Sequence, residues 1–402
     1  MISLSDIEAA RERIRGAVKL TPCMPSDSLS KQLGCEVYLK LENLQRTGSF
    51  KERGALNRLL ALTPEERRRG VITASAGNHA QALSYHAGRL GIPVTVVMPE
   101  PAAINKVNAN RALGARIVFH GALYDEASIE AHRLQAAENL VYIHPFDDDL
   151  TLAGAGTIGL ELSEQIPGLQ ATLVAVGGGG LAAGVAVALK AKLPQARLIG
   201  VETRAFSTLE KSLQANDRIT VPAARTIADG ISVRTIGERT FPILRDLIDE
   251  VVTVDDEEIA QAILALLEQD KTVAEGAGAA PLAGLMRVAP KLQGKKVALV
   301  ICGGNIDTNL LARIIERGLL KAGRRSKLRL NLLDRPESLA RLTQTLADRR
   351  ANVLAISHDR MSADSAPDEV TVELTLETRG EAHVIELLAE LTARGYRPQR
   401  FH

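Results

Sequence analysis

Short apolar runs alternate with segments of helical periodicity along most of this chain, and that alternation restricts the possible folds more than any other feature. Strands are expected at 37–41, 71–74, 93–98, 115–120, 172–176, 198–202 and 296–301. Helices are expected at 6–18, 126–139, 182–191 and 308–319, and a further helix follows the strand at 71–74 and its loop and ends at 89. Ser5 or Asp6 is the expected cap of the first helix. Strands that alternate with helices form parallel sheets covered on both faces. We therefore expect an α/β fold of two lobes with a cleft between them, the smaller lobe at about 50–150.

The charges of the chain balance, which argues against some classes of partner. The 402 residues include 49 Lys and Arg against 48 Asp and Glu, a net charge of +1. This balance favours neither nucleic acid nor a membrane surface, and the first residues lack the basic and apolar regions of a signal peptide. The three separated cysteines form no disulfide or zinc pattern. We expect a cytoplasmic protein that binds a small molecule, with no nucleic-acid or membrane partner.

Lys51 stands at a junction between a loop and a helix. It follows Phe50 in a segment flanked by glycine and serine, and a helical pattern begins after it. A lysine at such a place can point into a cleft and act as a nucleophile for a Schiff base, if burial or nearby positive charge lowers its pKa from about 10.4. The alternative is a lysine that only begins a charged helix, with Glu52 and Arg53 as solvated neighbours, which is the commoner fate of lysine.

Four consecutive glycines followed by a leucine, Gly177–Leu181, join an expected strand to an expected helix. Glycines at this place let backbone amides approach a phosphate closely, and the N-terminal end of the helix favours negative charge. A flexible turn is one alternative. A dinucleotide loop is another, because Gly177, Gly179 and Ala182, with Glu202 at the end of the next strand, fit that fingerprint loosely. Phosphate binding is favoured over a purely structural turn.

Two further loops lie at the ends of expected strands. Ser75–His79 could present backbone amides and the Ser75 hydroxyl to a carboxylate, and Asn78 offers both a donor and an acceptor. An ordinary helix cap is the alternative, and a lone histidine such as His79 is more often structural than catalytic. Cys302 could likewise be a small buried hydrophobe. Ligands in open α/β sheets bind at the carboxyl ends of strands, where these loops and the glycine loop would meet.

Four motifs occur in a characteristic order and spacing. They are Ser-Phe-Lys-x-Arg-Gly-Ala at 49–55, Ser-Ala-Gly-Asn-His-Ala-Gln at 75–81, Gly-Gly-Gly-Gly-Leu at 177–181 and Cys-Gly-Gly-Asn at 302–305. Together they resemble the pyridoxal-phosphate (PLP) enzymes of the threonine/serine dehydratase (threonine ammonia-lyase) family over residues 1–321. The resemblance implies the tryptophan-synthase-β-like fold, fold type II. It also implies conversion of L-threonine to 2-oxobutanoate and ammonia, with L-serine to pyruvate as a second reaction.

The same resemblance implies roles for individual residues. Lys51 would hold PLP through a Schiff base and afterwards exchange protons, and Phe50 would lie against the cofactor ring. Asn78 would contact the ring hydroxyl, and Cys302 would face the pyridine nitrogen. The phosphate would be bound by Gly177, Gly178, Gly179, Gly180 and Leu181, and the substrate carboxylate would be surrounded by Ser75, Gly77, Asn78 and His79.

Three positions refine this expectation. Many relatives have serine where Cys302 stands; both groups are neutral, which favours elimination over a long-lived carbanion. The related serine racemases have a serine where this chain has Ala76, so efficient racemisation is not expected. The loop after Glu202 lacks the second acidic residue of the racemase divalent-metal site, and no metal is expected.

A separate module follows the basic linker 322–327. Residues 328–402 predict a strand at 328–333, a helix at 338–349, strands at 353–358 and 370–376, a helix at 382–394 and a short strand at 397–401. This order is typical of a ferredoxin-like α+β module. Residues 334–340 and 351–353 resemble the ACT domain, which binds amino acids, often at a dimer interface. That implies an allosteric effector and a homo-oligomer, a dimer or tetramer.

Glu337 weakens the effector hypothesis. The ACT family usually has glycine there, whereas glutamate adds bulk and a negative charge that repels an amino-acid carboxylate. A module that only mediates oligomer contacts is an equal alternative.

Other functions stay open at this stage. A non-catalytic nucleotide or amino-acid sensor on the same fold would have no need of Lys51. Among enzymes, a serine racemase, a β-replacement synthase and a hydroxyaspartate dehydratase are the nearest rivals. Threonine and serine differ by one methyl group, worth only about 1 to 3 kcal/mol of discrimination. The sequence therefore leaves open both the preferred substrate and whether the role is isoleucine biosynthesis or threonine catabolism.

Overall fold

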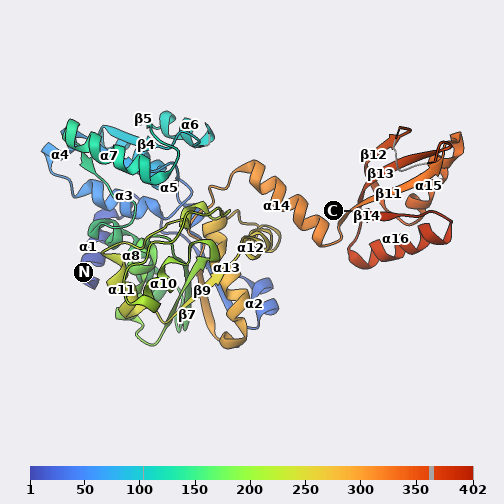
Figure 1. Ribbon diagram of the computed structural model, residues 1–402. Coiled ribbons are helices and arrows are strands. Elements are labelled where there is room, and N and C mark those ends of the chain that lie inside the picture. Colours follow the sequence, from blue (N-terminus) through green and yellow to red (C-terminus); the bar gives the residue numbers. More distant parts are fainter. Residues whose placement is uncertain (103, 362–365, 402) are drawn as a thin grey trace. The chain divides into compact units, whose positions relative to one another are not determined.

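Two sheets organise residues Met1–Ile306, the first of the two units into which the chain divides. The computed structural model in Figure 1 describes residues 1–102, 104–361 and 366–401. One sheet has four strands and the other six, and every pairing in them is parallel except that of one edge strand. The prediction of an α/β fold with parallel sheets is confirmed.

The small lobe is built on the four-stranded sheet. Its strand order is β5-β4-β3-β6, with β3 at Val71–Ala74, β4 at Val94–Met98, β5 at Arg116–Phe119 and β6 at Val141–Tyr142. Side chains of successive strand residues point to opposite faces. Val71 and Val96 accordingly pack with α5 (Asn78–Arg89), and Ile72 and Val97 with α7 (Tyr124–Glu138). Both faces are thus covered, and the helices lie around the sheet as Figure 1 shows.

The large lobe is built on the six-stranded sheet, of order β1-β2-β10-β7-β8-β9. Its strands are β1 at Cys23–Pro25, β2 at Glu36–Lys40, β7 at Ala171–Ala175, β8 at Arg197–Thr203, β9 at Glu250–Val254 and β10 at Lys296–Val300. Strand β2 lies beside β10, from the other end of the unit, and β1 is the antiparallel edge. Helices α8 (Asp149–Gln165) and α9 (Gly180–Lys192) pack so closely that a Cβ on Gly184 would lie 2.5 Å from the carbonyl oxygen of Leu152.

The other helices of this unit are α1 (Leu4–Ile14), α2 (Asp27–Leu33), α3 (Lys51–Leu60), α4 (Pro64–Arg69), α6 (Ile104–Ala112), α10 (Thr208–Ala215), α11 (Thr240–Leu247), α12 (Asp256–Gln269) and α13 (Gly276–Val288). The expected start of the first helix was wrong. Ser3 is the cap, because its side chain accepts from the Asp6 backbone N–H while Asp6 bonds back to the Ser3 backbone N–H. Asp6 is therefore the third residue of the helix, not its cap.

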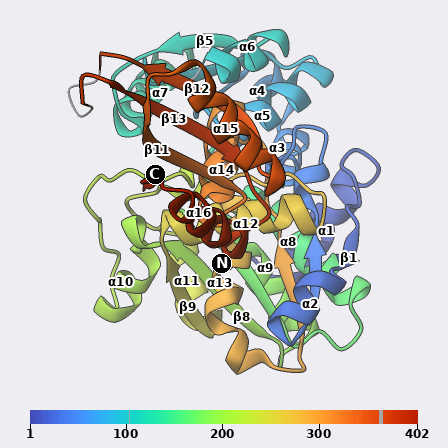
Figure 2. The same ribbon diagram turned by 90° about the vertical axis from the view of Figure 1, so that its right-hand side faces the viewer.

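Residues Asp307–His402 form the second unit. After α14 (Thr308–Lys321) come β11 (Arg325–Leu333), α15 (Pro336–Asp348), β12 (Asn352–Asp359), β13 (Glu369–Glu377), α16 (Glu381–Ala393) and β14 (Gln399–Phe401). The strands pair antiparallel in the order β12-β13-β11-β14. Helices α15 and α16, labelled in Figure 2, both contribute leucines to the core of this unit. This confirms the ferredoxin-like topology.

The boundary between the units differs from the expected linker. Contacts divide the chain after Ile306, so α14 belongs with the second unit. Strand β11 starts at Arg325, inside the segment expected as linker, because Ser326 is buried and Arg325 pairs with Glu316 of α14.

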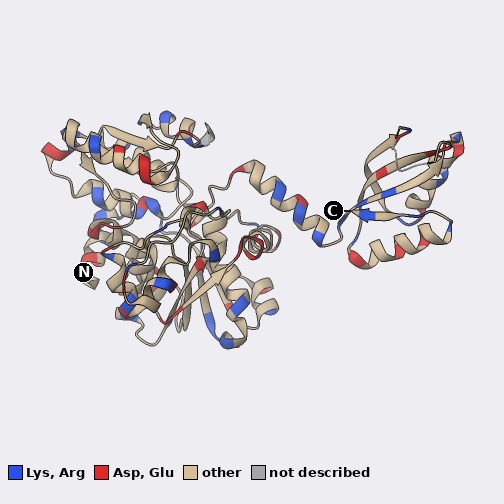
Figure 3. Cartoon of the chain, viewed as in Figure 1, with Lys and Arg blue, Asp and Glu red and all other residues tan. Residues whose placement is uncertain are grey.

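Charge is mixed over both units. Figure 3 shows basic and acidic segments side by side on the helices of each unit. Among the residues that the structure describes, no helix has the length and apolar character needed to span a bilayer.

Candidate active site

Lys51 is the first residue of α3, held in place by the chain around Cys302. The Phe50 backbone N–H donates to the Cys302 carbonyl oxygen at 2.9 Å, and Ser49 forms an isolated β-bridge with Gly303. The Lys51 Nζ atom donates to the Pro145 carbonyl oxygen at 2.7 Å. Burial lowers the pKa of Lys51 to about 8, while Cys302 and Glu275 act in the opposite direction. A neutral, nucleophilic amine is therefore accessible near neutral pH.

Helix α3 is fixed by a buried cluster of charges centred on Arg53. The Arg53 guanidinium donates to both carboxylate oxygens of Glu42 at 2.8 Å and to Glu161 at 2.6 and 2.8 Å. Lys40 also contacts Glu161, at 2.5 Å. Burial opposes ionisation of Arg53, but the two carboxylates outweigh it and raise its pKa above the ordinary range. The alternative in which Lys51 only begins a charged helix, with Glu52 and Arg53 as solvated neighbours, is wrong, since both of these side chains are fully buried.

The glycine loop follows β7 and opens α9. Gly179 has φ +92°, which favours glycine, and a Cβ on Gly178 would lie 2.3 Å from the Phe146 ring. The first backbone N–H groups of a helix have no partner within it. The loop can therefore offer several amides, with the positive end of the thirteen-residue α9, to a phosphate.

The Ser75–His79 loop connects β3 to α5. The Ser75 hydroxyl oxygen accepts from the Gly77 backbone N–H at 3.2 Å, and α5 begins at Asn78. The amides of Asn78 and His79 thus lie in the first turn of a helix, where they have no intrahelical acceptor.

The His79 ring is not available as a hydrogen-bond donor to a carboxylate, although a histidine in this loop could have had that role. Its Nε2 atom pairs with the Ile143 carbonyl oxygen at 3.1 Å, so Nε2 carries the hydrogen and Nδ1 is left as an acceptor. Burial, with Lys51 nearby, lowers the pKa of His79 to about 3. The ring is neutral and has no hydrogen to give to a carboxylate, which leaves the backbone amide as the group that can bind an anion.

Cys302 lies two residues after Val300, the last residue of β10. Its side chain is 3 % exposed, and burial raises the pKa of the thiol well above its ordinary range. The thiol is therefore neutral at physiological pH.

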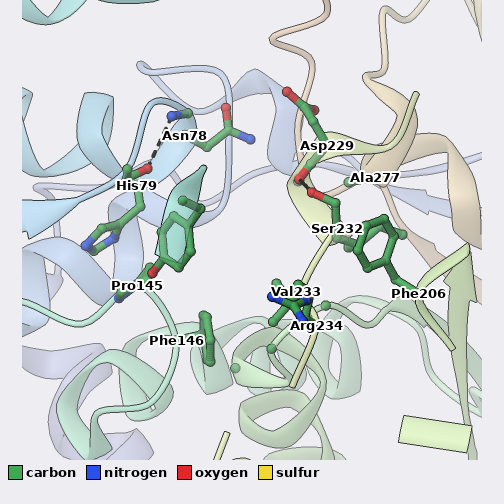
Figure 4. A pocket seen from close by; sticks show the side chains of 18 of the residues that line it. Asn78, His79, Pro145, Phe146, Phe206, Asp229, Ser232, Val233, Arg234 and Ala277 are labelled. Atoms are coloured by element: carbon green, nitrogen blue, oxygen red, sulfur yellow. Dashed lines mark hydrogen bonds between the residues drawn. The ribbon is translucent and has the colours of Figure 1, made fainter. Parts of the chain in front are cut away.

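One cavity of about 630 Å³ brings these groups together. Every residue expected from the sequence lines it, namely Phe50, Lys51, Ser75, Gly77, Asn78, His79, Gly177, Gly178, Gly179, Gly180, Leu181 and Cys302. In Figure 4, Asn78 and His79 lie across the cavity from Asp229, Ser232 and Phe206. The carboxyl ends of three parallel strands thus converge on one site.

The cavity also contains residues that the sequence motifs did not indicate. Pro145 and Phe146, from the loop after β6, contact the lysine amine and the glycine loop. Glu275, at the start of α13, donates its backbone N–H to Gly303 and accepts from the Asn78 side chain. Glu275 precedes the small-residue run 276–280, but no motif in the sequence marks it, and only the fold places it in this cavity.

The residues present fit PLP. The cofactor needs a nucleophilic amine for its aldehyde, amides for its phosphate and an apolar wall for its ring. The Lys51 amine has a lowered pKa, which suits the aldehyde. The glycine loop has no side chains between its backbone amides and the cavity, since Phe146 lies where a Cβ on Gly178 would be, and Phe50 is part of the cavity wall.

Comparisons with known proteins agree with this geometry. The family model described as pyridoxal-phosphate dependent enzyme matches residues 14–303. The L-threonine ammonia-lyase of Geobacter sulfurreducens is 47% identical over 397 residues, which is 98% of each chain. The solved structure of threonine deaminase isoform 2 from Solanum lycopersicum superposes with a TM-score of 0.74 at 36% identity, covering 78% of this chain and 91% of that one. Serine racemase from Dictyostelium discoideum superposes with a TM-score of 0.72 at 36% identity, covering 76% of this chain and 99% of that one.

Proposed function

Because the chain belongs to the family of pyridoxal-phosphate-dependent enzymes, we propose that it acts as a threonine ammonia-lyase. The reaction is the β-elimination of water from L-threonine and release of ammonia, which gives 2-oxobutanoate; L-serine gives pyruvate in the same way. The water lost from the Cα–Cβ unit is balanced by the water that later releases ammonia. The near full-length similarity to a lyase of that name supports threonine as the substrate.

PLP, when bound, supplies an aldehyde for a Schiff base and a conjugated ring that accepts the electrons of the substrate Cα–H bond. Lys51 Nζ is the group that binds this aldehyde carbon. With the substrate amine at that carbon, Lys51 Nζ would be free to accept the substrate α-proton. Its pKa of about 8 leaves a usable fraction of the neutral form near pH 7.

The loop Gly177–Leu181 binds the phosphate through backbone amides at the start of α9. Cys302 would face the pyridine nitrogen as a neutral thiol, so it would provide no charge to hold that nitrogen protonated. A carboxylate there would do so. The chain thereby favours elimination over a long-lived carbanion.

Ser75, Gly77, Asn78 and His79 bind the substrate carboxylate. The amides at the start of α5 and the Ser75 hydroxyl are the donors, with His79 contributing through its backbone. The side-chain amide of Asn78 contacts the hydroxyl of the cofactor ring.

One observation carries this proposal: a buried lysine of lowered pKa faces the same cavity as the glycine loop. The test is an absorbance spectrum before and after L-threonine, with 2-oxobutanoate measured in the same sample and Lys51→Ala as the control. We expect a visible band that the variant lacks, and 2-oxobutanoate from the wild type alone. A protein that stays colourless with added PLP would contradict the proposal and favour the sensor, and one that binds PLP but makes no 2-oxoacid would contradict the proposed reaction.

Racemisation is the alternative with a structural argument, since a serine racemase superposes on the first unit. Ala76, which replaces the serine of racemases, lines the cavity and packs partly against the small-lobe core. It has no proton to exchange. Incubation of L-serine should give pyruvate without D-serine, and Ala76→Ser should introduce D-serine formation.

The second unit is proposed to be an ACT domain that mediates contacts of a homo-oligomer in the cytoplasm. Glu337 stands in the first turn of α15, where a carboxylate is favourable to the helix, and pairs with Arg341 at 3.2 Å. It is thus satisfied within its own helix, and its charge opposes an amino-acid carboxylate.

Sedimentation of the full chain with and without L-isoleucine tests this assignment. We expect an oligomer of unchanged size and no bound amino acid for the wild type. Glu337→Gly should permit binding if the site is otherwise that of an effector. A monomer at micromolar concentration would contradict the proposal.

A further inference from the structure

Glu275 is a buried carboxylate that serves no function in its own helix. It occupies the cap position of α13, yet its side chain makes no hydrogen bond to the backbone of that helix. A capping acid ordinarily accepts from the second or third backbone N–H. Here the Glu275 side chain, 5 % exposed, accepts instead from the Asn78 Nδ2 atom at 2.6 Å. The carboxylate is thus committed to the cavity.

The backbone opposite leaves room for this carboxylate. A Cβ on Gly303 would lie 2.2 Å from Glu275 Oε1 and 3.1 Å from Asn78 Nδ2. The Glu275 backbone N–H also donates to the Gly303 carbonyl oxygen at 3.0 Å. Glycine directly after Cys302 therefore lets Glu275 reach Asn78, the residue proposed to contact the ring hydroxyl of the cofactor.

The side-chain amide of Asn78 is held from both ends. Asn305 Nδ2 donates to Asn78 Oδ1 at 2.8 Å and also to the Thr47 carbonyl oxygen at 2.7 Å. Glu275 accepts from the other end. An amide nitrogen carries two hydrogens, so Asn78 keeps a second N–H for a ligand in the cavity. The carbonyl oxygen of the same amide is directed at Asn305 and not at the ligand.

We infer that Glu275 is a positioning residue for the cofactor: it orients the Asn78 amide so that an N–H, and not the carbonyl oxygen, meets the hydroxyl oxygen of the PLP ring. That oxygen carries negative charge in the bound cofactor and needs a donor. The inference rests on the proposed PLP site. Without the carboxylate, the amide can rotate and bring two oxygens together, which is repulsive.

The surroundings of Glu275 also make its effect depend on pH. The ionisable groups that act on it are Lys51 of α3, Lys106 of α6, Asp229 of the short helix at Asp229–Ile231, and Cys302 after β10. Burial raises the pKa of Glu275 to about 7, Asp229 adds to this, and the bond from Asn78 opposes it. The carboxyl thus gains its negative charge around neutral pH.

The test compares PLP affinity and the visible absorption band of the bound cofactor in three variants. Glu275→Met keeps the volume but removes the acceptor, and Glu275→Gln keeps an acceptor oxygen without the charge. Glu202→Gln is the matched control. Glu202 is also buried, and burial raises its pKa to about 7, but it accepts from the backbone N–H groups of Leu209 and Glu210 and does not line the cavity.

Removing the acceptor should weaken PLP binding by about tenfold or more, the effect of one charged hydrogen bond, and shift the band. Glu275→Gln should bind within about threefold of the wild type but lose the change of the band with pH near 7. Glu202→Gln should match the wild type in both. In the background of Asn78→Ala, Glu275→Met should add less than a twofold loss, because the two residues act as one unit.

The inference is overturned if Glu275→Met binds PLP with wild-type affinity and band, or if its effect is the same with Asn78→Ala. Glu275→Ala replaces the methionine variant if that variant does not fold. A wild type that does not bind PLP would refute the proposed function itself, which separates the two failures.

Discussion

The Lys51 amine donates a hydrogen bond of 2.7 Å to the carbonyl oxygen of Pro145. The next residue, Phe146, fills the space in which side chains on Gly178 and Gly180 would lie. One short loop of the small lobe therefore lies against both the Lys51 amine and the glycine loop of the large lobe, which is proposed to bind the phosphate.

Incorporation of PLP into the apoprotein should accelerate with pH up to about pH 8, because only the neutral Lys51 amine reacts. The pKa of Lys51 falls from 10.5 to about 8 on folding, so the unfolded chain binds more protons between those values. The stability of the apoprotein should therefore rise with pH across that window. Stopped-flow absorbance and thermal unfolding measure the two effects. A rate that keeps rising to pH 10 would contradict the lowered pKa.

Arg53→Met should destabilise the protein by about 3 to 5 kcal/mol, because Glu42 and Glu161 lose the partner of their buried charges. Denaturant unfolding measures the loss. Arg116→Ala is the control, since its pair with Glu138 is largely exposed and should be worth about 1 kcal/mol or less. Equal effects of the two variants would mean that the buried cluster has no special part in fixing α3.

Gly178→Ala should reduce PLP affinity by about tenfold or more, since the new methyl group would meet the Phe146 ring and displace the phosphate-binding amides. Gly168→Ala is the control. Unlike Gly178, Gly168 has a positive φ, of +77°, but it has open space around it and no part in the cavity. It should cost stability and leave PLP affinity unchanged. Titration of the apoproteins with PLP distinguishes the two.

Two ion pairs join the lobes beside the cavity. Arg234 contacts Asp125 of α7 at 2.8 Å, and Lys106 of α6 contacts Asp229 at 2.6 Å. Both are partly exposed, and salt should weaken them. We expect KM for threonine to rise severalfold between 0.05 and 0.5 M salt, and the double variant Asp125→Asn, Asp229→Asn to show a high KM at all salt concentrations. A double variant with the wild-type salt dependence would contradict this role.

The sequence predicted the elements around the cavity well because their signals are local. The boundaries of α5 and β4 follow from apolar periodicity and from Gly77 and Pro93 beside them. All four motifs lie at strand ends or helix starts, and parallel strands bring such ends to one edge of a sheet. Each residue expected at the site consequently lines the cavity, while the roles given to these residues remain predictions.

What the sequence did not reveal depends on contacts between distant segments. Glu275 accepts from an asparagine at position 78, and Arg53 is buried by a glutamate at position 161. No pattern near either residue encodes its partner. A charged side chain is expected at the surface by default, so both burials follow only from the tertiary fold.

The pairing of β2 with β10 has a consequence for the synthesis of the protein. Strand β2 leaves the ribosome early, but its parallel neighbour ends at Val300. The small-lobe strands, between Val71 and Tyr142, pair among themselves and need no later segment. The growing chain can thus complete the small lobe before β10 and the residues after it, which lie around Lys51, have been synthesised. A nascent chain stalled before residue 296 carries a finished small lobe and no working centre.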